Sequence, residues 1–146
     1  MKEFTESGTT IYYVVGKVIP FGEGRVVLSY DAIGTTVNDK AEGLFHNATQ
    51  RILGGMTMDK GIYKDERGSG VWTLENGDKV FFTFELAGET KQGGGGFGKG
   101  TCTFVGGTGK CAGIKGSFEV TRYVVRTSAE GIGHSYSQAK IKYTLP

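Results

Sequence analysis

The chain has 146 residues, of which 26 are Gly and only 2 are Pro. This length supports one hydrophobic core, so we expect a single domain over residues 1–146. The glycines do not follow the three-residue repeat of collagen, which excludes a collagen-like chain. The aromatic content of 12% is too high for a disordered chain. The net charge of +2 comes from basic residues spread along the chain, so no nucleic acid is expected as a partner.

The N-terminal residues carry no targeting pattern. Glu3 and Glu6 lie where a signal peptide would be basic, and the apolar run over residues 11–20 is interrupted by Gly16 and Lys17. No segment reaches the ~18 apolar residues that a membrane helix needs. If the chain is full length, these observations predict a cytoplasmic protein with no membrane partner.

Apolar and polar residues alternate with a period of two in almost every segment, which predicts strands separated by turns. The clearest hairpin signal is Asn76-Gly77-Asp78. No window of ten residues supports an amphipathic helix. The expected strands cover residues 10–19, 25–36, 42–53 with a short continuation at 56–59, 70–74, 79–86, 100–105, 117–127 and 133–145.

Consecutive strands with short connections and no crossover helices are most simply closed as an up-and-down barrel. The sequence therefore predicts an all-β protein with a single eight-stranded antiparallel barrel. The interior of a barrel of about eight strands is either filled by side chains or holds one small ligand. We expect such an interior cavity here.

The cysteines and histidines give no support for a metal site. Cys102 and Cys111 would face each other if Gly106-Gly107 formed the turn between two strands, and would miss each other if the turn lay two residues later. We expect two reduced, packed thiols. His46 and His134 are far apart in the sequence and have no second ligand nearby, so no metal is predicted.

Two glycine-rich stretches have the spacing of nucleotide-binding loops but not their context. Residues 93–100 lack the Ser or Thr of a phosphate loop, and residues 107–112 are followed by further glycines. Neither stretch precedes a predicted helix, whose N-terminus would bind the phosphate. No cofactor is therefore expected.

The segment FVGGTGKCAGIKGSF, residues 104–118, resembles the glycine-rich hairpin of dirigent proteins and of the allene oxide cyclase barrel superfamily. The segments FHN at 45–47 and GDKVF at 77–81 are similar to strands of small bacterial proteins related to them. The resemblance implies a calycin-like barrel with a largely apolar cavity, and a homo-oligomer, either a trimer or a dimer. It does not define a reaction, because one fold hosts many activities.

Ionisable residues on predicted strands are the candidates for chemistry. Glu85 shares a strand face with Phe81 and Thr83; inside the barrel it would have a raised pKa and suit acid or base catalysis, and outside it would be solvated. Arg122 and Glu119 lie on opposite faces of their strand. An inward Arg122 would bind a substrate carboxylate or enolate, and an outward one would be solvated or make an interface contact.

His46 shares the face of Leu44, Ala48 and Ile52 on the strand expected at residues 42–53. It is either an acid or base in the cavity or a core histidine held by the backbone. The seven tyrosines and one tryptophan suggest a ligand on which rings stack and which hydroxyl groups orient. The predicted substrate-binding residues are Tyr13, Tyr30, Trp72, Phe81, Glu119 and Tyr136.

These observations predict a cofactor-free enzyme that binds a small hydrophobic or aromatic molecule in the barrel. The reaction class would be an isomerisation, cyclisation or lyase step, driven by acid and base groups and by conformational control. The predicted catalytic residues are His46, Glu85, Arg122 and Tyr123. The alternatives are a barrel that only binds such a ligand, and a structural protein with a filled core.

Overall fold

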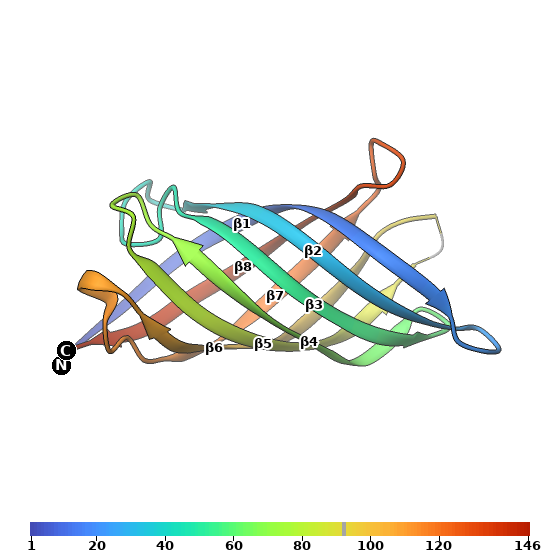
Figure 1. The fold of residues 1–146 in the computed structure, drawn as a ribbon. Coiled ribbons are helices and arrows are strands. Elements are labelled where there is room, and N and C mark those ends of the chain that lie inside the picture. Colours follow the sequence, from blue (N-terminus) through green and yellow to red (C-terminus); the bar gives the residue numbers. More distant parts are fainter. Residues whose placement is uncertain (92) are drawn as a thin grey trace.

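The structure, a computed structural model that describes residues 1–91 and 93–146, is a closed antiparallel barrel (Figure 1). Each strand pairs with its neighbours in the sequence, and β8 pairs with β1. The prediction of an all-β, eight-stranded up-and-down barrel is confirmed. The strands are β1 (Lys2–Pro20), β2 (Arg25–Asn38), β3 (Thr49–Asp59), β4 (Ile62–Thr73), β5 (Lys79–Thr90), β6 (Gly96–Gly107), β7 (Ser117–Val125) and β8 (Gly133–Leu145), with the short helix η1 (Gly109–Cys111) between β6 and β7.

Three predicted strand starts were wrong by seven or more residues. The first strand was expected from residue 10, whereas β1 begins at Lys2. The third strand was expected from residue 42, but residues 39–48 form turns and bends and β3 begins at Thr49. Ala41, Gly43 and Asn47 have positive φ angles, which interrupt an extended conformation. The fourth strand was expected only from residue 70, whereas β4 begins at Ile62 and includes charged residues that resembled a loop.

Glycines on neighbouring strands make room for inward aromatic rings. A Cβ atom at Gly34 would lie 2.7 Å from Cδ1 of Tyr12, and one at Gly54 would lie 2.7 Å from the hydroxyl oxygen of Tyr30. In each pair the aromatic side chain crosses the position where the neighbouring strand has no side chain. Part of the high glycine content therefore follows from placing large rings inside a narrow barrel.

Both termini lie at one end of the barrel (Figure 1), and buried side chains from two connections pack at that end. Phe45, from the 39–48 connection, is 1% exposed and packs against Trp72 and Phe104 at ring-centroid distances of 4.5 and 5.8 Å. Cys111 and Ile114, from the connection between β6 and β7, are buried at the same end. These two connections close that end of the barrel.

Both cysteines are buried and unpaired, as expected. Cys102 lies opposite Phe118 in the register of β6 and β7, and Cys111 belongs to η1. The two-residue turn at Gly106-Gly107 that would have brought the thiols face to face is absent, because the connection runs over residues 108–116.

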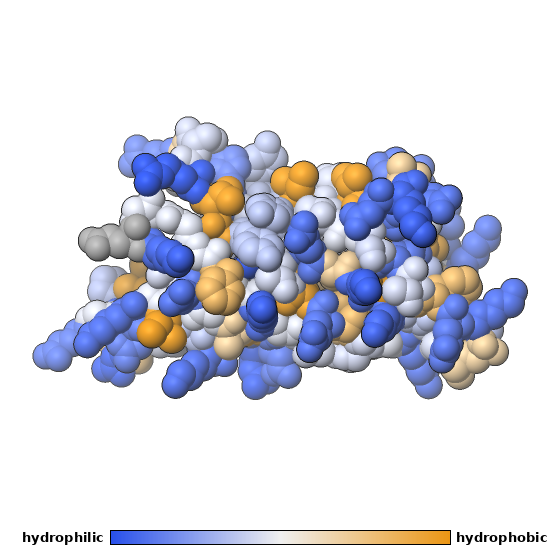
Figure 2. Space-filling view, turned by 180° about the vertical axis from the view of Figure 1, so that it is seen from behind, coloured by the Kyte–Doolittle hydropathy of each residue, from blue (hydrophilic) through white to orange (hydrophobic). Residues whose placement is uncertain are grey.

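The outer surface mixes hydrophilic and apolar side chains. Figure 2 shows, on the side away from the viewer in Figure 1, apolar residues in small groups between hydrophilic ones. Across residues 1–91 and 93–146, no helix has the length and apolar content needed to cross a membrane.

Candidate functional site

Inward side chains surround a pocket of about 210 Å³ in the barrel. Trp72, Phe82 and Ile141 line it and are almost fully buried, whereas Val14 and Val124 are half-buried. The half-buried residues lie toward the end opposite the termini, which indicates the end at which the pocket is more open. An apolar cavity of roughly 150 Å³ is enough to hold a benzene ring, so this pocket has room for a small molecule.

A buried ion pair lies beside this pocket. Glu66 on β4 is 0% exposed and Arg122 on β7 is 15% exposed. Arg122 donates from Nη1 to Oε2 of Glu66 at 2.5 Å and from Nη2 to Oε1 at 2.7 Å. Two parallel contacts between a guanidinium and a carboxylate form the strongest and most directional type of ion pair in proteins.

Two tyrosines complete the ion-pair cluster, which we define as Tyr30, Tyr63, Glu66 and Arg122. Tyr30 donates its hydroxyl proton to Oε2 of Glu66. The hydroxyl oxygen of Tyr63 accepts a hydrogen bond from Nη2 of Arg122 at 2.8 Å, and its proton is directed to the carbonyl of Phe97 at 3.3 Å. The strands β2 and β7 and the bulged part of β4 thus meet at one polar cluster.

A β-bulge brings Tyr63 and Glu66 to the same side of the barrel. Tyr63 pairs with Gly88 and Glu66 with Leu86, so β4 has one more residue than β5 over this stretch. Simple alternation would have placed these two residues on opposite faces. Instead both are buried, while Lys64 and Asp65 between them are exposed.

The surroundings of the ion-pair cluster raise the pKa values of Arg122 and Tyr30. Burial acts to lower the pKa of Arg122, but the hydrogen bonds and the charge of Glu66 outweigh it and raise this pKa above its ordinary value. Burial, reinforced by the charge of Glu66, also raises the pKa of Tyr30. Tyr30 therefore stays a neutral hydrogen-bond donor, and the cluster has no net charge.

The donors of Arg122 are not all used. Its Nε is buried and has no hydrogen-bond partner among the described residues, because Glu66 and Tyr63 engage only Nη1 and Nη2. A buried donor on a charged group is costly when it is left without an acceptor. Nη1 also has a second N–H without a partner among the described residues, and an acceptor atom of a bound molecule would satisfy it.

A second polar group lies deeper in the barrel and is satisfied internally. Tyr12 donates to Oε1 of Gln50 at 2.7 Å, and the hydroxyls of Thr10 and Thr36 lie 2.7 Å apart. The indole N–H of Trp72 donates to the Thr36 hydroxyl at 3.0 Å. Burial raises the pKa of Tyr12 to about 12, so its phenol is also neutral.

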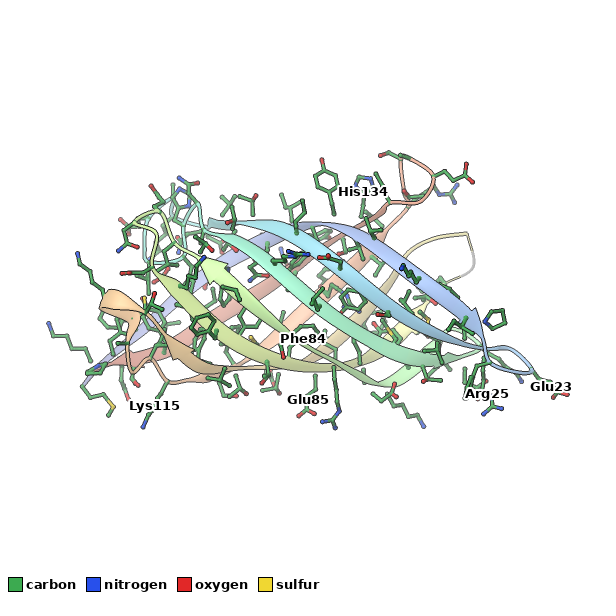
Figure 3. The ribbon with its side chains drawn as sticks, viewed as in Figure 1. Glu23, Arg25, Phe84, Glu85, Lys115 and His134 are labelled. Atoms are coloured by element: carbon green, nitrogen blue, oxygen red, sulfur yellow. The ribbon has the colours of Figure 1, made fainter. Side chains whose placement is uncertain are left out.

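Three of the predicted site residues, Arg122, Tyr30 and Trp72, line the pocket. The other predicted site residues that lie on strands point outward. Phe84 points into the barrel and Glu85 points away from it (Figure 3). The Glu85 side chain is 63% exposed, and its Oε2 lies 3.4 Å from Nη2 of Arg67. Of the two positions considered for Glu85 the outer one is therefore observed, and its predicted catalytic role in the cavity is corrected.

The remaining outward residues follow from the same alternation. Tyr13 is 58% exposed, and Glu119 is also exposed. Tyr123 and Tyr136 stack on each other outside the barrel, with ring centroids 5.1 Å apart. Phe81 borders a separate groove on the outer surface. None of these five residues lines the interior pocket, because Arg122 and Ser137 occupy the inward positions beside Tyr123 and Tyr136.

His46 lies in the 39–48 connection rather than on a strand. Its Nδ1 accepts a hydrogen bond from the backbone N–H of Asn38 at 3.1 Å. His46 is half-buried and does not line the pocket. The contact favours the alternative in which this histidine is held by the backbone and supports the connection that closes the barrel.

Glu66, Tyr63, Tyr12 and Gln50 were missed as site residues. Glu66 lies within a run of four charged residues, 64–67, that is typical of a turn. One signal was present: Trp72 and Gly70 share the inward face of β4, and continuing their alternation toward the N-terminus reaches Glu66. A strand extended this far would have placed a carboxylate inside the barrel.

Among the described residues there is no group of three or more His, Cys, Asp or Glu side chains that could hold a metal ion. Comparison of the sequence with protein-family models gives no match, and comparison with curated proteins finds no similar sequence. The resemblance of the glycine-rich hairpin to dirigent proteins and allene oxide cyclases therefore stays a prediction.

Proposed function

We propose that the barrel binds a small, mainly apolar or aromatic molecule in its interior pocket, with one polar group directed at Arg122. The observation that carries this proposal is the buried ion pair beside an otherwise mostly apolar pocket, with the arginine as its more exposed partner. Ligand sites commonly combine apolar walls with a few polar groups that set the orientation of the ligand.

The apolar part of the ligand would lie among Trp72, Phe82 and Phe118, which line the deeper part of the pocket. Ring centroids of Trp72 and Phe82 are 4.9 Å apart, so these rings already form an aromatic wall. Arg122 lies on β7 between this wall and the more open end, since Phe118 and Val120 precede it on the inward face and Val124 follows it.

Trp72 provides a direct test of binding. It is the only tryptophan, so its indole N–H gives one cross-peak in a two-dimensional NMR spectrum. Titration with acetophenone, a small aromatic ketone, is expected to shift this cross-peak in a saturable manner. In the double variant Glu66→Leu/Arg122→Met the shift should require about tenfold more ligand. The matched outer variant Arg51→Met should bind as the wild type does, and absence of saturable binding to the wild type would contradict the proposal.

A second candidate function is the predicted cofactor-free isomerase, cyclase or lyase. It is favoured by the Arg122 guanidinium in a pocket of low dielectric, where it would stabilise negative charge that develops on an enolate oxygen. Glu85 and His46 lie outside the pocket, and Glu66 would have to give up its contacts with Arg122 and Tyr30 before it could act as the base. Its test is deuterium exchange at the methyl group of acetophenone in D₂O, which the wild type should accelerate and the double variant should not.

A homo-oligomer, as the family resemblance implies, is also a proposal. It is supported by exposed apolar side chains on the outer faces of β1 and β2, including Ile11, Tyr13 and Ile33, each more than half exposed. Sedimentation velocity should show a dimer or trimer, and a monomer at all concentrations would contradict this. Replacing Tyr13 with Lys should weaken any such assembly.

A further inference from the structure

We propose that the polar group of the ligand is a neutral hydrogen-bond acceptor, such as a carbonyl or ether oxygen, and not a carboxylate or an amine. This inference deepens the proposed function and rests on it. It follows from how the charges and the donors of the ion-pair cluster are arranged around the pocket.

The partner that faces the pocket is a donor. Glu66 is fully buried, whereas 15% of the Arg122 side chain is exposed and Arg122 lines the pocket. Both carboxylate oxygens of Glu66 already accept a hydrogen bond from Arg122, and Oε2 accepts another from Tyr30. An ammonium group of a ligand would meet the guanidinium without a free carboxylate, so cationic ligands are excluded.

The tyrosine hydroxyls are also engaged. Tyr30 uses its proton on Glu66, and Tyr63 directs its proton to the Phe97 carbonyl while accepting from Arg122. Of the five N–H groups of Arg122, Glu66 and Tyr63 engage three, so Nε and the second N–H of Nη1 remain without a partner among the described residues. The cluster therefore offers hydrogen-bond donation from the arginine, and its ligand must supply an acceptor.

The charge of Arg122 is already neutralised. Its guanidinium lies 2.5 Å from the Glu66 carboxylate, so a ligand carboxylate would bring a second anion close to Glu66 in a site of low dielectric. Such a ligand would also lose its hydration on entering the pocket, without an unpaired positive charge to compensate. A carbonyl oxygen satisfies a donor without adding charge.

The position of Arg122 along the barrel adds a constraint on shape. The aromatic wall of Trp72, Phe82 and Phe118 lies on its deeper side, and half-buried Val124 lies on the side toward the open end. A ligand with a ring on the deeper side of Arg122 would direct its acceptor toward the guanidinium, on the side of the open end. The ligand class is therefore a small cyclic or aromatic ketone, aldehyde or ether.

Four probes of similar size test this inference on the wild type: toluene, acetophenone, benzoate and benzylammonium at neutral pH, each followed through the Trp72 indole cross-peak. Acetophenone should bind at least about tenfold more tightly than benzoate and benzylammonium, and more tightly than toluene. Benzoate binding that equals or exceeds that of acetophenone would overturn the inference while leaving the proposed function intact. Failure of all four probes to bind would overturn both.

A charge variant provides a second test. Glu66→Gln retains the side-chain shape but leaves the positive charge of Arg122 without a counterion, so benzoate should now bind more tightly than acetophenone. The matched control is Asp31→Asn, which removes the carboxylate of an outer ion pair and should leave the wild-type ranking unchanged. An unchanged ranking in a folded Glu66→Gln variant would contradict the inference; if this variant does not fold, the ranking on the wild type still decides.

Discussion

Two arginine–carboxylate pairs with similar geometry lie on opposite sides of the barrel wall. Arg122 and Glu66 are joined by contacts of 2.5 and 2.7 Å inside, and Arg51 and Asp31 by contacts of 2.8 and 3.3 Å outside. The inner side chains are 15% and 0% exposed, and the outer ones are 68% and 43% exposed. Breaking the inner pair should therefore lower the stability of the fold strongly and breaking the outer pair only weakly, because water competes only for the outer pair.

Adjacent residues of β4 show how little separates these environments. Glu66 is buried against Arg122, whereas Arg67 points outward and lies 3.4 Å from Glu85. A shift of one residue in the register of β4 would exchange the inner and outer charges. Regular alternation from Trp72 through Gly70 places Glu66 inside, and the bulge that precedes Glu66 in the sequence brings Tyr63 to the same side.

The largest expected effect comes from breaking the inner pair. Arg122→Ala leaves the Glu66 carboxylate buried without its counterion, which should lower the free energy of unfolding by about 3–5 kcal/mol. Urea denaturation measures this loss directly. If Arg122→Ala is as stable as the wild type, Glu66 does not depend on Arg122 as its buried counterion.

Replacing both inner charges should restore most of the lost stability. In Glu66→Leu/Arg122→Met no charge remains buried, and such replacements are often neutral or stabilising by roughly 1–4 kcal/mol. We expect the double variant to be clearly more stable than Arg122→Ala in the same urea experiment. If its stability equals the sum of the two single losses, the two residues do not act as a pair.

Alkaline pH should destabilise the barrel through its interior. Burial raises the pKa of Cys102 to about 12 from an ordinary value of 9.0, and that of Tyr12 to about 12 from 10.0. Each group ionises more readily in the unfolded chain, so the stability it contributes is present below its ordinary pKa and is lost as pH rises toward 12. Thermal unfolding between pH 8 and 12 should show this decline. It should be less steep in Tyr12→Phe, and an equal slope would contradict the assignment.

The smallest effect is expected at the outer pair. Arg51→Met removes a solvent-exposed contact, so the urea midpoint should move by only a small fraction of the shift seen with Arg122→Ala. Any effect should diminish further in high salt, which screens exposed charges. A loss comparable to that of Arg122→Ala would remove the distinction between the two pairs.

The barrel was predictable because alternation, short turns and the absence of helices all agreed. Arg122 was predictable as an inward candidate for the same reason, since β7 is regular around it. Glu66 was not, because a bulge and a run of four charged residues obscured its strand. His46 was misplaced because Ala41, Gly43 and Asn47 adopt positive φ angles that the apolar pattern did not indicate. The face of β5 that points inward, and hence the outward position of Glu85, depended on the register of the closed barrel.

The most direct test of the proposed site is a crystal structure of the protein soaked with acetophenone. We predict that the phenyl ring lies in the interior pocket, on the side of Arg122 that faces Trp72 and Phe118, and that the carbonyl oxygen lies within hydrogen-bond distance of the Arg122 guanidinium. Acetophenone bound only on the outer surface, or inside with its carbonyl directed away from Arg122, would contradict the account.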